Sequence, residues 1–278
     1  MSEMLDPMRY PRPYIMAIAN QKGGVGKTTT TINLAAALVE MGARVLLVDL
    51  DPQGNASTGL GILPSMRKKT SYDLIIEELP LAETVMETDF KGLYICPSNS
   101  DLSSADMELV SNEKRSFLLH DSLRGPGMEA LDMDFVLIDC PPSLSLLTVN
   151  ALVASHAVLV PLQAEFFALE GLSQLMLTIR EVRQSANPGL RIEGVALTMV
   201  DGRNRLSQQV ENDARKTLGD LVFKTVIPRN VRLSEAPSYA LPVLIYDSAS
   251  KGSEAYRALA AEVLARHPIT PRDPQERN

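Results

Sequence analysis

Short runs of apolar residues recur along this chain, and the stretches between them carry apolar residues at helical spacing. Several of the runs are apolar almost throughout, which is typical of strands covered by helices on both faces of a sheet. The predicted strands span residues 14–20, 44–50, 92–98, 135–141, 157–163, 194–200, 223–228 and 242–247.

A helix is predicted between the first two strands. Ile32, Ala35, Ala36 and Val39 follow the i, i+3, i+4, i+7 spacing of an apolar helix face, and Gly42 stands where helices commonly end. The alternation of strand and helix favours an α/β fold. We expect a doubly wound, mostly parallel sheet with helices on both faces.

A single domain is expected over residues 14–266, because no internal repeat or long linker divides the chain. Residues 1–13 are expected to form a flexible extension, which has acids and prolines but no apolar core of a signal peptide. Prolines in residues 267–278 prevent the last predicted helix from continuing, so this tail is expected to be disordered. No apolar run approaches the ~18 residues of a membrane span, and a cytoplasmic protein is predicted.

Composition narrows the classes of function. The two cysteines, Cys96 and Cys140, have no paired spacing, so neither a disulfide framework nor a zinc site is predicted. His120, His156 and His267 are scattered and match no catalytic arrangement. The net charge of −7 argues against a protein that coats nucleic acid with its whole surface, although it leaves room for a local basic patch.

The stretch NQKGGVGKTTT, residues 20–30, follows the first predicted strand and opens the first predicted helix, as a phosphate-binding loop does. Its glycines let backbone N–H groups face phosphate oxygens, and the helix N-terminus adds partial positive charge. Lys27 is placed to reach the β- and γ-phosphates of a nucleotide, and the Thr28 hydroxyl to hold Mg²⁺. The usual pattern has a further glycine where this chain has Gln21, and an additional lysine, Lys22, lies inside the loop.

The segment KGGVGKTTT, residues 22–30, resembles the deviant Walker A loop of the MinD/ParA superfamily of ATPases. The resemblance implies ATP and Mg²⁺ as cofactors. It also implies that Lys22 crosses the interface of a nucleotide-sandwich homodimer and contacts the partner's ATP, so that both Lys22 and Lys27 serve catalysis. The nucleotide-binding residues expected in the loop are Lys22, Gly23, Gly24, Val25, Gly26, Lys27, Thr28 and Thr29.

Further segments extend the resemblance to the chromosomal ParA/Soj branch over roughly residues 14–266. They are DLDPQGNAST (49–58), FVLIDCPPSLS (135–145), IPRNVRLSEAPS (227–238) and YDSASKGSEAY (246–256). The resemblance implies a P-loop NTPase type of fold and a role in segregating a chromosome or plasmid. It further implies an ATP-bound dimer that binds DNA without sequence preference on the nucleoid, and a ParB-type adaptor that stimulates hydrolysis and release.

Three aspartates are candidates for the chemistry of phosphoryl transfer, which requires charge neutralisation and a positioned water. Asp139 ends an apolar strand of Walker B form and is predicted to hold Mg²⁺, with Asp49 as a second member of the metal shell. By resemblance, Asp51 orients or activates the attacking water, and Pro228 and Asn230 line the base pocket.

Positive charge gathers in the segment from Arg203 to Arg232, which has seven basic and three acidic side chains in a chain of net charge −7. Such a segment favours a face that meets a phosphate backbone, although charge alone fits a solvated helix face equally well. The resemblance implies that Arg203 and Arg232 bind DNA. No helix-turn-helix pattern precedes the loop, so sequence-specific reading of DNA is not expected.

Other functions share this ATPase core. The main alternative is a MinD-like positioning ATPase at the membrane, which requires a C-terminal amphipathic helix that the proline-broken tail does not provide. A reductase of the nitrogenase iron-protein type requires suitably placed cysteines, which Cys96 and Cys140 are not. A ligase of the dethiobiotin synthetase type acts on a metabolite, and stimulation of ATP hydrolysis by DNA and an adaptor would exclude it.

Overall fold

The structure is a computed structural model that describes residues 12–165 and 168–269. In this part of the chain eight strands form one sheet in the order β3-β4-β2-β5-β1-β6-β7-β8. All neighbouring strands are parallel except β3 and β4, so the predicted mostly parallel sheet is confirmed. The strands are β1 (Tyr14–Ile18), β2 (Val45–Asp49), β3 (Met86–Glu87), β4 (Leu93–Cys96), β5 (Phe135–Asp139), β6 (Ala157–Gln163), β7 (Arg191–Val200) and β8 (Val222–Pro228).

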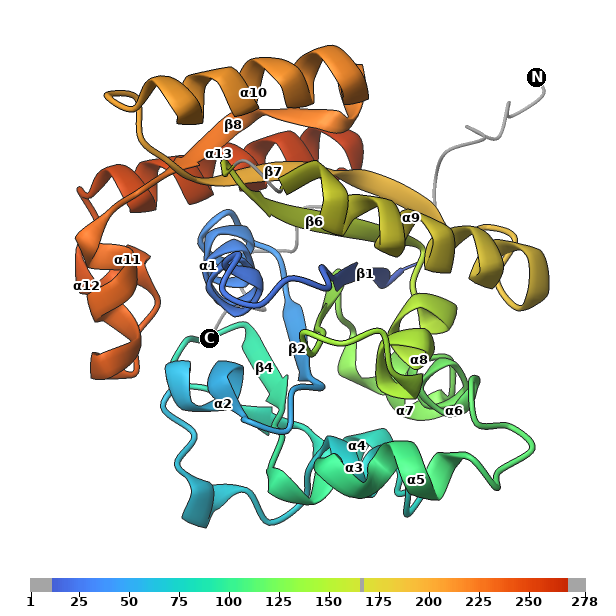
Figure 1. Cartoon of the computed structure of the whole chain (residues 1–278). Coiled ribbons are helices and arrows are strands. Elements are labelled where there is room, and N and C mark those ends of the chain that lie inside the picture. The colour runs from blue at the N-terminus through green and yellow to red at the C-terminus, as the bar shows by residue number, and fades with distance from the viewer. Residues whose placement is uncertain (1–11, 166–167, 270–278) are drawn as a thin grey trace, which may run out of the picture.

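Helices cover both faces of the sheet, with α10 next to the edge strand β8 and α3 to α5 beyond the opposite end (Figure 1). The α-helices are α1 (Lys27–Glu40), α2 (Asn55–Gly59), α3 (Ser71–Ile75), α4 (Leu81–Thr84), α5 (Ala105–Leu109), α6 (Leu118–Leu123), α7 (Pro126–Leu131), α8 (Leu146–Ala154), α9 (Ala168–Ser185), α10 (Arg205–Leu218), α11 (Val231–Glu235), α12 (Val243–Tyr246) and α13 (Lys251–Arg266). Four 3₁₀ turns in the described residues are η1 (Pro64–Met66), η2 (Ser100–Ser104), η3 (Gly219–Leu221) and η4 (Ala236–Tyr239).

Two apolar cores lie on opposite faces of the sheet, and alternate residues of each central strand point into one or the other. In β1, Ile15 and Ala17 belong to the core under α8 and α9, whereas Met16 and Ile18 belong to the core under α1 and α13. All four side chains are at most 1% exposed. This double burial explains why the runs are continuously apolar instead of alternating.

The strand order reverses direction at β1. From β1 the chain passes through α1 to β2 on one side, and from β5 it passes through α8 to β6 on the other side of β1. In open α/β sheets the crevice at such a switch point, beside the carboxyl ends of the strands, is where ligands bind. The loop after β1 opens into this crevice.

One predicted strand is wrong: within residues 242–247, Val243–Tyr246 form the short helix α12 instead. Pro242 precedes the helix, and the backbone N–H of Val243 donates to Asn33 Oδ1 of α1 at 2.7 Å. Val243 and Leu244 are buried against the core that contains α1 and α13. Burial against helices therefore decides the conformation of a run that resembles a strand in isolation.

The predicted extension and tail fall mainly on residues 1–11 and 270–278, which lie outside the described residues. Of the predicted tail, His267 stacks on Tyr14 of β1 with ring centroids 3.8 Å apart, and its Nε2 lies 2.9 Å from Glu193 Oε2. In the described ranges, no helix has both the length and the apolar character needed to cross a membrane.

Candidate nucleotide site

The loop between β1 and α1 has the geometry of a phosphate cradle. Gly24 and Gly26 have φ values of 74° and 87°, in the left-handed region that favours glycine. Val25 is buried, and its carbonyl accepts a hydrogen bond from Thr198 Oγ1 of β7 at 2.8 Å. The loop is thus fixed to the sheet on one side, while α1 begins at Lys27 and presents the N–H groups of its first turn.

Lys27 is buried in the site, with 7% of its surface exposed. Its Nζ donates to the backbone carbonyl of Lys22 at 3.1 Å, which holds the side chain across the loop. Burial lowers the pKa of Lys27, and the nearby charges of Asp139 and Asp51 oppose this shift. A buried ammonium held in this way is suited to bind phosphate oxygens.

Asp139 and Asp49 lie side by side at the ends of β5 and β2, where they are paired in register and fully buried. Asp139 accepts hydrogen bonds from Thr28 Oγ1 at 2.8 Å and Thr31 Oγ1 at 3.0 Å. The pKa of Asp139 is raised to about 8, mainly by burial and to a lesser extent by repulsion from Asp49. The sequence therefore brings Thr28 and Asp139 together as predicted, and Thr31 is an additional partner that it did not identify.

Asp49 organises the loop that follows β2. Its carboxylate accepts hydrogen bonds from the Ser57 backbone N–H at 2.9 Å, from Ser57 Oγ at 2.7 Å and from the Asp51 N–H at 3.2 Å. Burial raises the pKa of Asp49 to about 6. Asp51 is 8% exposed, and its Oδ1 accepts from the Gln53 N–H at 2.9 Å. With its oxygens engaged by Ser57 and Asp51, Asp49 fixes the position of Asp51.

The charges of the site fit a divalent cation. Asp49, Asp51 and Asp139 are three buried carboxylates, and Lys27 is the buried cation that faces Asp51 and Asp139. No group of three or more His, Cys, Asp or Glu residues in the described ranges forms an all-protein metal cage. Mg²⁺ is commonly held by one or two carboxylates together with waters and substrate phosphates. Thr28 and Asp139 are the residues placed to hold it.

Lys22 has a different environment from Lys27. Its side chain is 37% exposed, and its Nζ lies 3.4 Å from Glu165 Oε2, beyond the end of β6. The backbone N–H of Lys22 donates to Asn20 Oδ1 at 3.0 Å, and the Asn20 side chain is fixed to the Pro161 carbonyl at 2.7 Å. Within one chain the second lysine is therefore paired with a carboxylate at the rim of the site.

A cavity of about 550 Å³ lies at the carboxyl ends of β6, β7 and β8, and Glu165, Met199, Asp201 and Arg229 contribute to its lining. It adjoins the predicted base-pocket segment, because Arg229 lies between Pro228 and Asn230. Asn230 itself caps α11, with its Oδ1 accepting from the Arg232 N–H at 2.8 Å. Met199 has a φ of 53°, an uncommon value for a non-glycine residue that no sequence pattern predicted.

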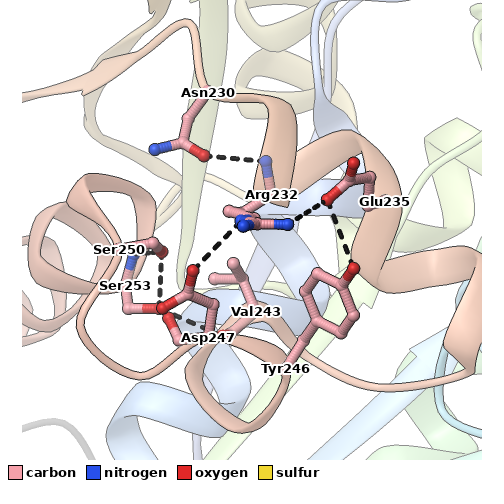
Figure 2. A network of polar contacts seen from close by, with 8 residues as sticks. All are labelled: Asn230, Arg232, Glu235, Val243, Tyr246, Asp247, Ser250 and Ser253. Atoms are coloured by element: carbon pink, nitrogen blue, oxygen red, sulfur yellow. Dashed lines mark hydrogen bonds and ion pairs between the residues drawn. The ribbon is translucent and has the colours of Figure 1, made fainter.

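The two arginines predicted to bind DNA have unequal surroundings. The Arg203 side chain is 93% exposed and, among the described residues, is paired with Asp201 at 3.3 Å. Arg232 lies between two carboxylates, with Nη1 2.8 Å from Glu235 and Nε 3.1 Å from Asp247 (Figure 2). The hydrogen bond and charge of Glu235 raise the pKa of Arg232. Arg232 therefore bridges α11 and the segment after α12, and its charge is locally compensated.

Comparison with known proteins identifies the family. A family described as an AAA domain matches residues 14–192. The chain is 56% identical over 252 residues to the chromosome partitioning protein ParA of Caulobacter vibrioides (strain NA1000 / CB15N), an alignment that covers 91% of this chain and 94% of that protein. It is 49% identical to the sporulation initiation inhibitor protein Soj of Bacillus subtilis (strain 168), with coverages of 90% and 98%.

This chain belongs to the ParA/Soj family of chromosome-partitioning ATPases. Among solved structures, cobyrinic acid a,c-diamide synthase from Mycobacterium smegmatis with bound ADP and magnesium has 37% identity and a TM-score of 0.77, covering 91% of this chain and 94% of that one. The septum site-determining protein MinD of Pyrococcus horikoshii, complexed with Mg-ADP, has 28% identity and a TM-score of 0.72, with coverages of 92% and 100%. The predicted family, fold type and ATPase activity are confirmed, whereas the roles of individual site residues remain predictions.

Proposed function

We propose that this ParA/Soj-family ATPase is the switch of a DNA partitioning system, located in the cytoplasm on the nucleoid. Its ATP-bound form is a sandwich homodimer that binds DNA without sequence preference. A ParB-type adaptor stimulates ATP hydrolysis, and the ADP form releases the DNA. The observation that carries the proposal is the contact between Thr28 and Asp139 beside the glycine loop, because it joins a phosphate cradle to a metal-binding carboxylate.

The residues of the chain divide the work of hydrolysis. The loop N–H groups and Lys27 would bind the phosphates, and Thr28 and Asp139 would hold Mg²⁺, which would supply charge neutralisation for phosphoryl transfer. Asp51 is fixed by its neighbours at the edge of the site, where its carboxylate orients the attacking water. This arrangement supports catalysis by positioning and electrostatics without a covalent intermediate.

The outer face of α10 supports DNA binding. Ser207, Val210 and Ala214 of this helix are buried against the body of the protein. Arg205 and Lys216 lie on the opposite, exposed side, since eleven residues correspond to about three full turns. No ion pair in the described residues involves either side chain. Two exposed cations on a helix at the edge of the molecule (Figure 1) are suited to phosphate contacts.

The alternative of a MinD-like membrane switch receives less support. Such a protein needs a helix with a spare apolar face. In α13, the last described helix, the large apolar side chains of Tyr256, Leu259 and Val263 are buried in the core of this chain, and Leu264 is partly buried against it. The sequence identity is also higher to the ParA and Soj proteins than to MinD.

The variant Asp51→Ala tests the hydrolytic role. We expect it to bind Mg²⁺-ATP and form the dimer, but to hydrolyse ATP slower by a factor on the order of 10² or more, because the attacking water loses its partner. The trapped dimer should elute as such and stay on DNA. Asp89→Ala, an exposed carboxylate before β4, is the control and should keep the normal rate. Normal turnover by Asp51→Ala would exclude the assigned role.

A further inference from the structure

Arg67 is a partly buried arginine that binds only neutral acceptors. Its Nε and Nη2 donate to the Ile62 carbonyl at 3.0 and 2.8 Å, and Nη2 also donates to Thr58 Oγ1 at 2.7 Å. Its Nη1 donates to the Ser98 carbonyl at 3.0 Å. No carboxylate of the described residues lies within ion-pair distance. Burial lowers the pKa of the guanidinium, and the charge of Asp49 opposes this shift. A partly buried cation without a direct ion pair is costly, so its place in the fold requires a reason.

The acceptors belong to three segments that surround the loop after β2. Thr58 is in α2, Ile62 is in the turn that follows it, and Ser98 is in the segment after β4. The Ser98 N–H donates to Ser57 Oγ at 3.0 Å, and the same hydroxyl donates to Asp49 Oδ2 at 2.7 Å. A continuous chain of hydrogen bonds therefore runs from Arg67 to Asp49, which accepts from the Asp51 N–H.

The guanidinium of Arg67 also packs directly against the loop after β2, at Gly54. Gly54 has a φ of 60°, and a Cβ atom built on it would lie 2.2 Å from Arg67 Nη1. The Gly54 N–H donates to the Asp51 carbonyl at 2.8 Å, which closes the turn that carries Asp51. Arg67 thus contacts the far end of this turn directly, and reaches its near end through Ser98, Ser57 and Asp49.

We propose that Arg67 is a positioning residue for ATP hydrolysis, which holds the turn of residues 51–54 so that the Asp51 carboxylate keeps its place. The inference rests on the proposed role of Asp51. The planar guanidinium supplies the donors for three acceptors in fixed directions, whereas a lysine ammonium is a point charge on a flexible stem. The shape of the group, in addition to its charge, is therefore required.

The test is Arg67→Lys, which keeps the charge and removes the planar fork. We expect ATP hydrolysis at saturating Mg²⁺-ATP to fall by roughly 10- to 100-fold, since a displacement of about 1 Å at a catalytic group has effects of this size. The affinity for a non-hydrolysable ATP analogue should change less than about threefold, because the phosphate loop and Lys27 are untouched. Arg67→Gln, which removes the charge as well, should be at least as slow.

A matched control is Arg124→Lys. Burial lowers the pKa of this guanidinium as well, and it donates to the Ala154 carbonyl at 3.4 Å at the end of α8, away from the carboxyl edge of the sheet. Its substitution should leave hydrolysis unchanged. Thermal unfolding of each variant shows whether it is folded. If Arg67→Gln does not fold, the hydrolysis rate of Arg67→Lys alone tests the role of Arg67.

The double variant Arg67→Lys/Asp51→Ala separates positioning from a general structural role. If Arg67 acts through Asp51, the double variant should be no slower than Asp51→Ala alone, because coupled sites are not additive. Normal hydrolysis by Arg67→Lys, or equal losses of analogue affinity and rate, would overturn the inference. If Asp51→Ala hydrolyses ATP at the normal rate, the proposed role of Asp51 is wrong. If Asp51→Ala is slow but Arg67→Lys hydrolyses ATP at the normal rate, only the proposed role of Arg67 is wrong.

Discussion

The strongest test of the DNA face is the salt dependence of binding by variants of Arg203 and Arg232. Each phosphate contact contributes about −0.9 to the slope of log affinity against log salt concentration. A symmetric dimer presents every side chain twice, so replacing one arginine removes up to about 1.8 from the slope. The loss should be similar on unrelated DNA sequences, because phosphate contacts carry no base information.

The structure predicts that the two arginines differ. Arg203 is 93% exposed with a single ion pair, so Arg203→Ala should approach the full change in slope. Arg232 has two carboxylates as partners, and Glu235 also accepts from Tyr246 Oη at 3.2 Å (Figure 2). One positive and two negative charges leave this network net negative. A phosphate that binds Arg232 therefore competes with these two carboxylates for the guanidinium and is repelled by their charge.

Variants that remove the carboxylate partners of Arg232 test the same point in the opposite direction. Glu235→Gln and Asp247→Asn should raise DNA affinity, because each deletes a negative charge beside Arg232 and frees its guanidinium for phosphate. Arg232→Ala should abolish the gain. Arg115→Ala is the matched control, because Arg115 is an exposed arginine in the segment between α5 and α6. These two helices lie across the molecule from α10 (Figure 1). Its slope should equal that of the unmodified protein.

Electrophoretic or surface-based titrations at several salt concentrations, with the ATP-bound dimer confirmed in parallel, provide the measurement. An unchanged slope for both Arg203→Ala and Arg232→Ala would mean that the DNA face lies elsewhere or does not exist. A lower affinity of Glu235→Gln, with dimerisation intact, would contradict the view that this carboxylate masks Arg232.

Two further predictions concern the phosphate loop and the stability of the fold. Lys27→Ala should lose ATP affinity itself, whereas Lys22→Ala should keep measurable affinity and lose the ATP-dependent dimer; equal losses by calorimetry would contradict the assignment in trans. At the amino edge of the sheet, burial lowers the pKa of His156 to about 4, while its Nδ1 accepts from the Ile15 N–H at 2.9 Å. Because the unfolded chain takes up this proton first, near pH 6.5, the contribution of His156 to the free energy of unfolding should be largest above that pH and fall by about 2 kcal/mol as the pH decreases towards 4.5. Urea unfolding isolates this contribution as the difference between the unmodified protein and His156→Gln, because Asp49 and Asp139 titrate in both; a difference that does not change with pH would assign the effect to other groups.

The sequence predicted the parallel sheet because each central strand is buried on both faces and therefore continuously apolar. It failed where contacts distant in sequence decide the conformation. The run at 242–247 is apolar enough for a strand, but Val243 is bound by Asn33 and packs between helices. The edge strand β3, Met86–Glu87, is too short to leave a pattern in the sequence.

The same reasoning applies to the site. The phosphate loop could be predicted because its residues are contiguous, and Asp139 because it ends an apolar strand. Thr198 and Arg67 were missed because their contacts, with Val25 and with Ser98, join segments far apart in the chain. A lysine or threonine in a motif can be predicted from its spacing to the other motif residues. An arginine that contacts a loop distant in sequence belongs to no such motif and cannot be predicted in this way.

The pairing of Lys22 with Glu165 explains how a second lysine can serve as a switch. The site already contains more buried carboxylates than buried cations, and a triphosphate adds negative charge that Mg²⁺ neutralises only in part. In the single chain Lys22 is held at the rim by Glu165, in an exposed ion pair of the kind that contributes little stability. Exchange of Glu165 for a partner's phosphates is favourable only when those phosphates are present, since phosphate is the more highly charged acceptor. Under the proposed assignment in trans, the same lysine would stay on its own chain without ATP and join two chains with it, so dimer formation would depend on the nucleotide without a large change in fold.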